Sequence, residues 1–318
     1  MILGFAPVLL LPRQAVATEV DTSQTFCVLV PHFKDEYWLS VGYGLEQQAK
    51  KQDVKLLFFE AGGYRSRERQ IAQLHECRDR QVDAILIGAV TSEHPELLSA
   101  IAEVNRGVPV FGLVNELHAP ELRASIGVDW EDMGLVIGLY LAARNPAGAE
   151  KKTAVLISGP PESGWIGPLE EGLRNGLDGS SLQLVAVFGA DTGLRQQLAL
   201  VEQALEEYPD TDYLIGSAPA VEAAIGLLNR ESQTKQPTLI STYISHTIKR
   251  SLLNGQVLAV PFDDPMAQGD MAIRAAVGVI PLEKELDFIG PEVVLLTRDE
   301  GLPDNIWLSP SDYFPTIE

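Results

Sequence analysis

Short apolar runs rich in Val, Ile and Leu alternate along this chain with longer stretches of helical period. Most of these runs are apolar at successive positions, which indicates burial on both faces, as in parallel strands covered by helices on each side. The pattern predicts strands at residues 25–30, 54–60, 84–90, 109–114, 124–128, 153–158, 182–188, 213–217, 238–243, 257–262 and 292–297.

Between the runs lie amphipathic stretches, which predict helices at residues 38–52, 68–80, 94–106, 131–143, 194–208 and 219–229. The predicted class is therefore α/β, with doubly wound parallel sheets. Eleven strands exceed one comfortable sheet, so we expect two lobes, and the polar stretch 143–152 is a candidate break. A ligand is expected where the loops after the strands of both lobes meet.

Charge and length narrow the function classes. The chain has 318 residues and a formal net charge of −20, which argues against binding to nucleic acid or to an anionic membrane surface. An apolar run at residues 2–11, followed by Ala15-Val16-Ala17, predicts a signal peptide over residues 1–18 and hence export, although no Lys or Arg precedes the run. A packed N-terminal arm is the alternative, because the run is too short to span a bilayer.

The usual catalytic signatures are missing from the sequence. It contains no G-x-S-x-G, no G-x-x-x-x-G-K-[ST] and no H-E-x-x-H motif. His32 and His246 fall on expected ligand-side loops, but no cluster at metal-ligand spacing accompanies them. The pair Gly62-Gly63 has too little pattern to cradle a phosphate. We therefore predict neither a metal nor a cofactor.

The expected ligand-side loops carry aromatic rings and carboxylates, with Lys34 and Arg65 as nearly the only cations. Aromatic faces together with carboxylates suit a cation, above all a methylated ammonium, which cannot donate hydrogen bonds and packs its methyl groups on rings. Rings that merely cap the ends of the sheet are the alternative. Asp35 is equally open, since aspartate is a common helix N-cap as well as a ligand contact.

Several of these loops together resemble one family. Residues 30–38, 60–64, 243–246 and 263–269 are similar to segments of type I periplasmic binding proteins, the ribose-binding group among them. The resemblance is closer to members that bind trimethylamine N-oxide, on Lys34-Asp35 before Tyr37-Trp38, on residues 129–134, and on Tyr243 before Ser245-His246. It runs from about residue 27 to residue 297.

The resemblance implies two parallel-sheet lobes joined by hinge strands that cross more than once. The break at 143–152 is then not the true boundary. By analogy, residues 24–128 with 264–291 form the N-terminal lobe, and residues 129–263 with 292–318 form the C-terminal lobe.

The resemblance also implies a ligand site. Tyr37 and Trp38 match positions whose rings sandwich the ligand in sugar-binding relatives, and Tyr243 replaces a carboxylate that grips a sugar hydroxyl. Asp35 and Asp263 match polar contact positions. Trp165 stands where sugar binders use arginine, which puts its role in doubt. The predicted ligand-binding residues are Asp35, Tyr37, Trp38, Tyr64, Asn115, Trp130, Tyr243 and Asp263.

The implied function is that of a periplasmic sensor protein that binds trimethylamine N-oxide between its lobes and informs a membrane sensor histidine kinase, without enzyme activity. In the periplasm, Cys27 and Cys77 are expected to form a disulfide, with two buried free thiols as the alternative. A transport receptor for a sugar or another methylated amine is the main rival function. A hydrolase or reductase that uses Asp35 and Asp263 is the rival from another class.

Overall fold

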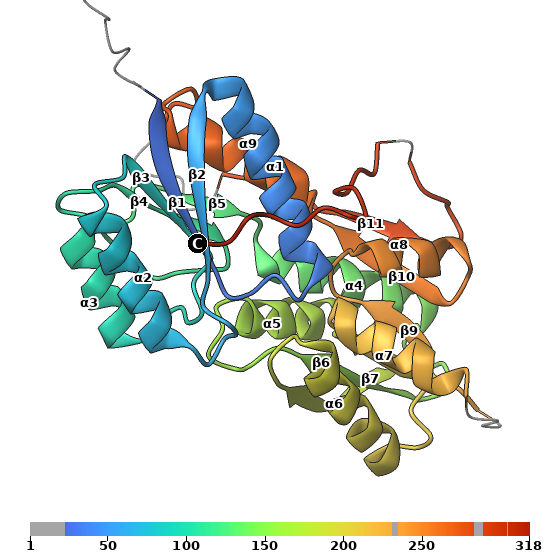
Figure 1. Ribbon diagram of the computed structural model, residues 1–318. Helices are drawn as coiled ribbons and strands as arrows, with labels where there is room; N and C mark the ends of the chain where they lie inside the picture. The colour runs from blue at the N-terminus through green and yellow to red at the C-terminus, as the bar shows by residue number, and fades with distance from the viewer. Residues whose placement is uncertain (1–22, 231–234, 283–288, 304) are drawn as a thin grey trace, which may run out of the picture.

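The computed structural model describes residues 23–230, 235–282, 289–303 and 305–318, which form two α/β lobes (Figure 1). The predicted signal peptide, residues 1–18, lies outside the described residues. The elements in chain order are β1 (Gln24–Val30), α1 (Glu36–Gln52), β2 (Val54–Glu60), α2 (Arg67–Asp79), β3 (Ala84–Ile87), α3 (Pro95–Val104), β4 (Val110–Val114), β5 (Ser125–Gly127), α4 (Trp130–Arg144), β6 (Lys152–Ser158), α5 (Ile166–Leu177), β7 (Leu182–Gly189), α6 (Leu194–Glu207), β8 (Tyr213–Gly216), α7 (Ala218–Leu228), β9 (Thr238–Ser241), α8 (His246–Leu253), β10 (Val257–Phe262), α9 (Pro265–Ala276) and β11 (Val294–Thr297).

The first lobe is built on a parallel five-stranded sheet in the order β2-β1-β3-β4-β5. Successive residues of β1 face opposite sides, so Phe26 packs into the core that α1 shares, while Cys27 packs into the core under α2 and α3. Helices α1 and α9 therefore cover one face of the sheet and α2 and α3 the other (Figure 1). This arrangement confirms the predicted doubly wound class.

A disulfide links the first strand of this sheet to the helix beneath it. Cys27 of β1 and Cys77 of α2 are bonded, and both residues are fully buried. The bond closes a loop of 50 residues within the first lobe. Its main physical effect is to restrict the unfolded chain.

The second lobe is built on a six-stranded sheet in the order β11-β10-β9-β8-β6-β7. All pairs are parallel except β10 with β11, which is antiparallel. Helix α4 packs with α5 on this sheet, and Leu141, Leu156 and Leu173 share one core cluster. The break expected at residues 143–152 therefore lies inside the second lobe, because the helix before it and the strand after it share that core.

The chain passes between the lobes after β5, after β10 and before β11, and its last residues return to the first lobe. Before β11, Ile289 donates to the carbonyl of Ser125 at 2.9 Å and accepts from Gly127 at 3.1 Å, whereas β11 pairs with β10 of the other lobe. We infer that residues 24–128 with 264–282 and 289–291 belong to the first lobe and that the second begins at residue 129.

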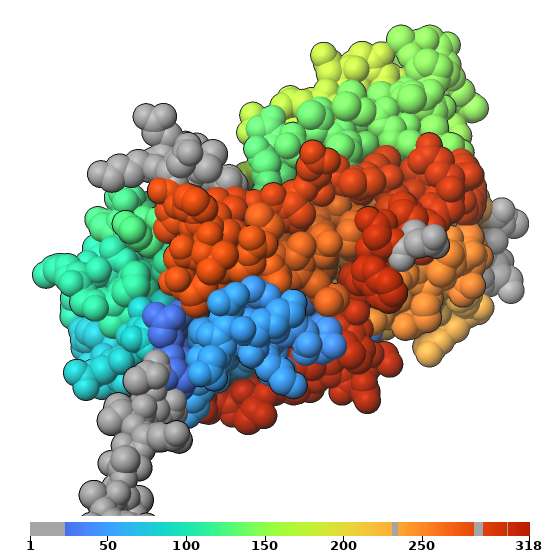
Figure 2. Space-filling model, turned by 90° about the horizontal axis from the view of Figure 1, so that it is seen from above, coloured from blue at the N-terminus to red at the C-terminus, as the bar shows by residue number. Residues whose placement is uncertain are grey.

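The last residues of the chain do not follow the expected division. Residues 292–318 were expected in the second lobe, but the stretch after residue 308 returns to the first. Glu318 donates to the carbonyl of Phe58 at 2.9 Å, and Ile317 bridges to Phe58 of β2. The C-terminus lies beside β2 in Figure 1, and in Figure 2 the red end of the chain lies against the blue surface of α1. The expectation was wrong here because β2 is an edge strand, whose free backbone groups the tail covers.

Within the described residues, no helix combines the length and apolarity that crossing a bilayer requires.

Candidate aromatic binding site

A small enclosed cavity lies where the ligand-side loops of the two lobes meet. Six aromatic rings form most of its wall, and they come from both lobes. The residues that line it are Asp35, Tyr37, Trp38, Tyr64, Val114, Asn115, Trp130, Trp165, Thr192 and Tyr243. The site therefore lies at the carboxyl ends of the parallel strands, where open α/β sheets hold ligands.

Asp35 both caps a helix and faces the cavity. One carboxylate oxygen, Oδ1, accepts the backbone N–H of Tyr37 at 3.1 Å at the start of α1. The other, Oδ2, accepts the hydroxyl of Tyr243 from the second lobe at 2.6 Å. Burial raises the pKa of Asp35, while these two hydrogen bonds oppose that rise. The choice between cap and site residue that the sequence left open is therefore not exclusive.

Asp263 stands behind the cavity wall. Its carboxylate accepts the hydroxyl of Tyr37 at 2.6 Å and the side-chain amide of Gln268 at 2.9 Å. The residue is fully buried, and burial raises its pKa to about 6. Of the predicted ligand contacts it is the one that does not line the cavity. Because Tyr37 stands between it and the cavity, Asp263 orients that ring and does not itself reach the space.

Hydrogen-bond donors converge on the hydroxyl of Tyr64. The side-chain amide of Asn115 donates to it at 3.3 Å and to the carbonyl of Ala89 at 2.8 Å. Burial raises the pKa of this hydroxyl, and the neighbouring side chains of Asn115, Trp38 and Trp165 oppose that rise only in part. With its oxygen accepting from Asn115, the hydroxyl keeps its own proton available for another acceptor.

The rings of the wall pack edge to face or at a tilt. The centroids of Trp130 and Trp165 are 5.2 Å apart, those of Tyr37 and Tyr243 5.3 Å, and those of Trp165 and Tyr243 5.9 Å. Such pairs hold one another in place. The wall thus consists of aromatic rings that pack against one another across the two lobes.

Most residues of this wall were predicted from the sequence. Apart from Asp263, every predicted ligand-binding residue lines the cavity, while their role as ligand contacts stays a prediction. Three lining residues were missed or doubted, namely Val114, Thr192 and Trp165. The position of Thr192, in the loop after β7, is the signal that was available, because that loop also follows the carboxyl end of a strand.

Size and charge limit what this cavity can hold. The centre of a water-sized sphere can move through about 10 Å³ of it, which is room for about one water. Among the lining residues, Asp35 has the only carboxylate, and none is Lys or Arg. The lobes are closed here, and a ligand of several heavy atoms enters only when they move apart.

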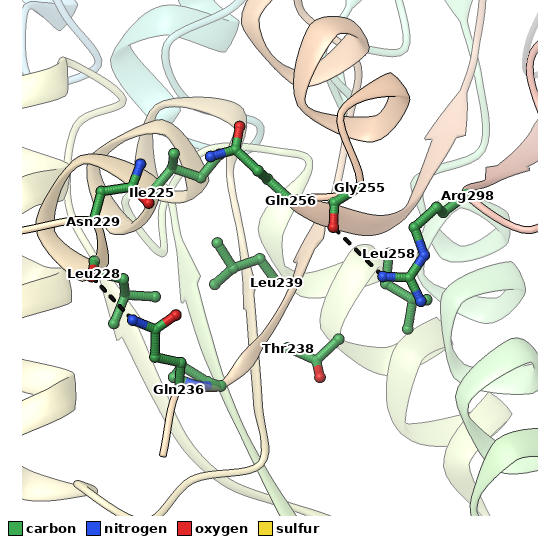
Figure 3. Close-up of a pocket in the computed structure, with 11 residues that line it drawn as sticks. Ile225, Leu228, Asn229, Gln236, Thr238, Leu239, Gly255, Gln256, Leu258 and Arg298 are labelled. Atoms are coloured by element: carbon green, nitrogen blue, oxygen red, sulfur yellow. Dashed lines mark hydrogen bonds between the residues drawn. The ribbon is translucent and has the colours of Figure 1, made fainter. Parts of the chain in front are cut away.

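A larger cavity of about 300 Å³, by the same measure, lies in the second lobe next to α7, at the opposite, amino-terminal edge of β9 and β10 (Figure 3). Gln236 and Arg298 on its rim donate to the carbonyls of Leu228 and Gly255. It contains no aromatic ring and no residue of the first lobe. Since it is remote from the meeting of the two sets of loops, we do not assign the binding site to it.

The two-lobed fold and the site between the lobes define a class. A model of the periplasmic binding protein domain matches residues 26–284, and the chain belongs to this family. It is 33% identical over 292 residues to the periplasmic protein TorT of Escherichia coli strain K12, which covers 91% of this chain and 83% of that protein.

Solved structures give the same relationship. The chain matches a crystal structure of the TorS sensor domain–TorT complex in the presence of TMAO with a TM-score of 0.79 and 34% identity, over 93% of this chain and all of that one. It also matches an ABC transporter solute binding protein from Bradyrhizobium sp. BTAi1 with bound bis-tris, with a TM-score of 0.73 and 30% identity, over 93% of this chain and 89% of that one.

Proposed function

We propose that this protein is a periplasmic sensor component that binds trimethylamine N-oxide between its lobes and reports the bound state to the periplasmic domain of a TorS-type sensor histidine kinase. The observation that carries the proposal is the cavity wall, which has six aromatic rings and one carboxylate and lacks Lys and Arg. Similarity to TorT over most of both chains supports the choice of ligand and partner.

The methyl groups of trimethylamine N-oxide carry part of the positive charge of its nitrogen. They cannot form hydrogen bonds, so they gain most from packing on the faces of Trp and Tyr, at ~0.5–2 kcal/mol per ring. Asp35 adds a carboxylate on the same wall. A sugar would need several charged or amide partners for its hydroxyls, and this wall supplies few.

The oxygen of the ligand needs a hydrogen-bond donor. The hydroxyls of Tyr37 and Tyr243 are already committed to Asp263 and Asp35. The hydroxyl of Tyr64 accepts from its neighbours and has its proton free. We assign the oxygen of the N-oxide to Tyr64, with the amide of Asn115 beside it.

Binding and signalling are linked through closure of the lobes. The wall residues come from both lobes, so a ligand that touches all of them binds the closed form better than the open one and shifts the population toward it. The kinase then distinguishes the two populations. The function includes no chemical step and needs no cofactor or metal.

Delivery to an ABC permease is the second candidate function. It is favoured by the 30% identical solute binding protein, in whose structure the bound molecule is bis-tris. Catalysis by the pair Asp35 and Asp263 is not proposed, because Asp263 does not line the cavity.

Calorimetric titration of the mature protein tests the proposal. We expect saturable binding of trimethylamine N-oxide, with ribose, betaine and choline as comparison ligands. Trp38→Ala removes one ring of the wall and should weaken binding about tenfold or more. Trp307→Ala is the matched control, since that tryptophan is 67% exposed and remote from the cavity. Binding of ribose in place of the N-oxide would favour the transport receptor. Pull-down of the kinase's sensor domain, with and without ligand, tests the partner.

A further inference from the structure

A carboxylate of the second lobe reaches across the cleft into the first. Asp191 lies in the loop between β7 and α6, beside the cavity residue Thr192. Its Oδ2 accepts the backbone N–H of Tyr64 at 2.8 Å, and its Oδ1 lies 3.2 Å from Nε2 of His32. Both partners belong to the first lobe, so these contacts exist only while the lobes are closed.

Gly63, after β2, belongs with His32 and Tyr64 to the docking site of Asp191 on the first lobe. Gly63 has a φ of +149°, and a Cβ built on it would lie 2.4 Å from Oδ2 of Asp191, nearer than real Cβ atoms approach an oxygen. A side chain at this position would therefore push the carboxylate out. Gly63, in a glycine pair without a phosphate-binding pattern, therefore has a physical role as the place where Asp191 docks.

The surroundings of Asp191 favour its ionised form. The side chain of His32 is fully buried, and that of Asp191 is 15% exposed. Burial disfavours the charged form of Asp191, but the nearby ring of His32, the backbone N–H of Tyr64 and the charge of Lys34 outweigh burial and lower the pKa of Asp191. In a chain with a net charge of −20, this is a specific site for one negative group of the opposite lobe.

The docking site of Asp191 also contacts the wall of the cavity. Tyr64 donates its backbone N–H to Asp191 and presents its ring to the cavity. Thr192, the next residue after Asp191, lines the cavity and has its hydroxyl oxygen 3.1 Å from Nε2 of His32. Docking of Asp191 therefore positions one residue of the cavity wall from each lobe, namely Tyr64 and Thr192.

We propose that Asp191 is a positioning residue whose docking against His32, Gly63 and Tyr64 holds the lobes closed and thereby sets the affinity for the ligand between them. A protein whose closed form is less populated binds its ligand more weakly by the same factor. The link to trimethylamine N-oxide rests on the proposed function, but the effect on closure does not.

The test measures closure separately from binding. Dyes attached to Ser99→Cys on α3 and Glu202→Cys on α6, both exposed and on different lobes, report the closed fraction by single-molecule energy transfer without ligand. We expect Asp191→Asn to reduce that fraction about tenfold and to weaken binding of trimethylamine N-oxide by the same factor. Gly63→Ala should act in the same way, and the double variant should add little to either single one.

Asp212→Asn is the matched control. Asp212 accepts the backbone N–H of Thr153 at 2.9 Å inside the second lobe, so its loss affects folding stability and leaves closure unchanged. Equal closed fractions in the wild type and Asp191→Asn would overturn the proposal. So would a wild type that shows no closed population with or without trimethylamine N-oxide. A wild type that closes but does not bind the N-oxide refutes the proposed ligand, and the closed fractions then decide the role of Asp191.

Discussion

The hydroxyl of Tyr243, after β9 on the second lobe, donates a hydrogen bond of 2.6 Å to Oδ2 of Asp35, just before α1 on the first. A second pair runs the other way, because Tyr37 of the first lobe donates to Asp263 of the second, also at 2.6 Å. The two tyrosine rings are 5.3 Å apart. Each ring is thus anchored at its hydroxyl by a carboxylate of the opposite lobe, and each lines the cavity.

Tyr243→Phe should weaken ligand binding while keeping the ring. The change leaves the buried carboxylate of Asp35 with fewer donors, so its pKa rises further and its attraction for a methylated nitrogen falls. We expect affinity for trimethylamine N-oxide to fall about tenfold and the unfolding temperature to fall as well. Calorimetry and thermal unfolding measure both effects. Tyr140→Phe is the control, since that hydroxyl accepts a hydrogen bond from Arg144 near the surface. Unchanged affinity in Tyr243→Phe would contradict the role given to the pair.

Gly88→Ala should displace a wall ring without altering any wall residue. A Cβ at position 88 would lie 2.3 Å from Cη2 of Trp38, so the indole must move. We expect ligand affinity to fall about as far as in Trp38→Ala, because the ring no longer stands where the methyl groups pack. Gly107→Ala has nothing within 4 Å of the added atom and should bind as the wild type does. Titration of the two variants side by side measures their affinities for the ligand. Equal affinities would show that Trp38 does not contribute to binding as part of the cavity wall.

Much of the fold was predictable because buried parallel strands have a simple signature. Their runs are apolar at successive positions, as in β1, where Phe26 and Cys27 enter different cores. The tail was not predictable in this way. Residues 309–318 have no helical or strand period, and their place beside Phe58 depends on the free edge of β2, which only the assembled sheet defines.

The site, too, was predictable from the sequence only in part. Aromatic residues after strands, such as Trp38 and Tyr243, were identifiable because aromatic residues are only 7% of the chain, while three of its four tryptophans fall on the expected ligand-side loops. The place of Asp263 behind the cavity wall was not predictable, because it depends on Tyr37 standing in front of it, a contact between residues 226 positions apart. Thr192 carried no compositional signal at all, since one small polar residue in a loop resembles any other.

Removal of the disulfide should destabilise the first lobe. A loop of 50 residues corresponds to about 4 kcal/mol in the chain-entropy account of a cross-link. We expect the variant with both Cys27→Ala and Cys77→Ala to unfold in less denaturant than the wild type. Its free energy of unfolding should be lower by an amount of that order. Treatment of the wild type with a reductant that reaches the buried bond should do the same and should leave the double variant unaffected. Denaturant titration followed by fluorescence measures it, and equal midpoints would contradict the stabilising role.

Stability should also depend on pH through Asp263. Burial raises its pKa to about 6 in the folded protein from the ordinary 3.8, so the folded state binds this proton more tightly than the unfolded chain does. Below about pH 4 both states are protonated. Between about pH 4 and pH 6 only the unfolded chain releases the proton, so this group lowers the free energy of unfolding as the pH rises, by about 3 kcal/mol in all. Above pH 6 its contribution is constant.

Asp263→Asn isolates that dependence. Asparagine keeps an oxygen that accepts from Tyr37 and Gln268, and it does not titrate. The difference in free energy of unfolding between the variant and the wild type should therefore shift in favour of the variant from pH 4 to pH 6 and then level off. Denaturant titrations at half-unit pH steps measure the difference. A difference that stays flat across this range would mean that Asp263 is ionised throughout it, and the hydrogen bonds from Tyr37 and Gln268 would then outweigh the burial of its charge.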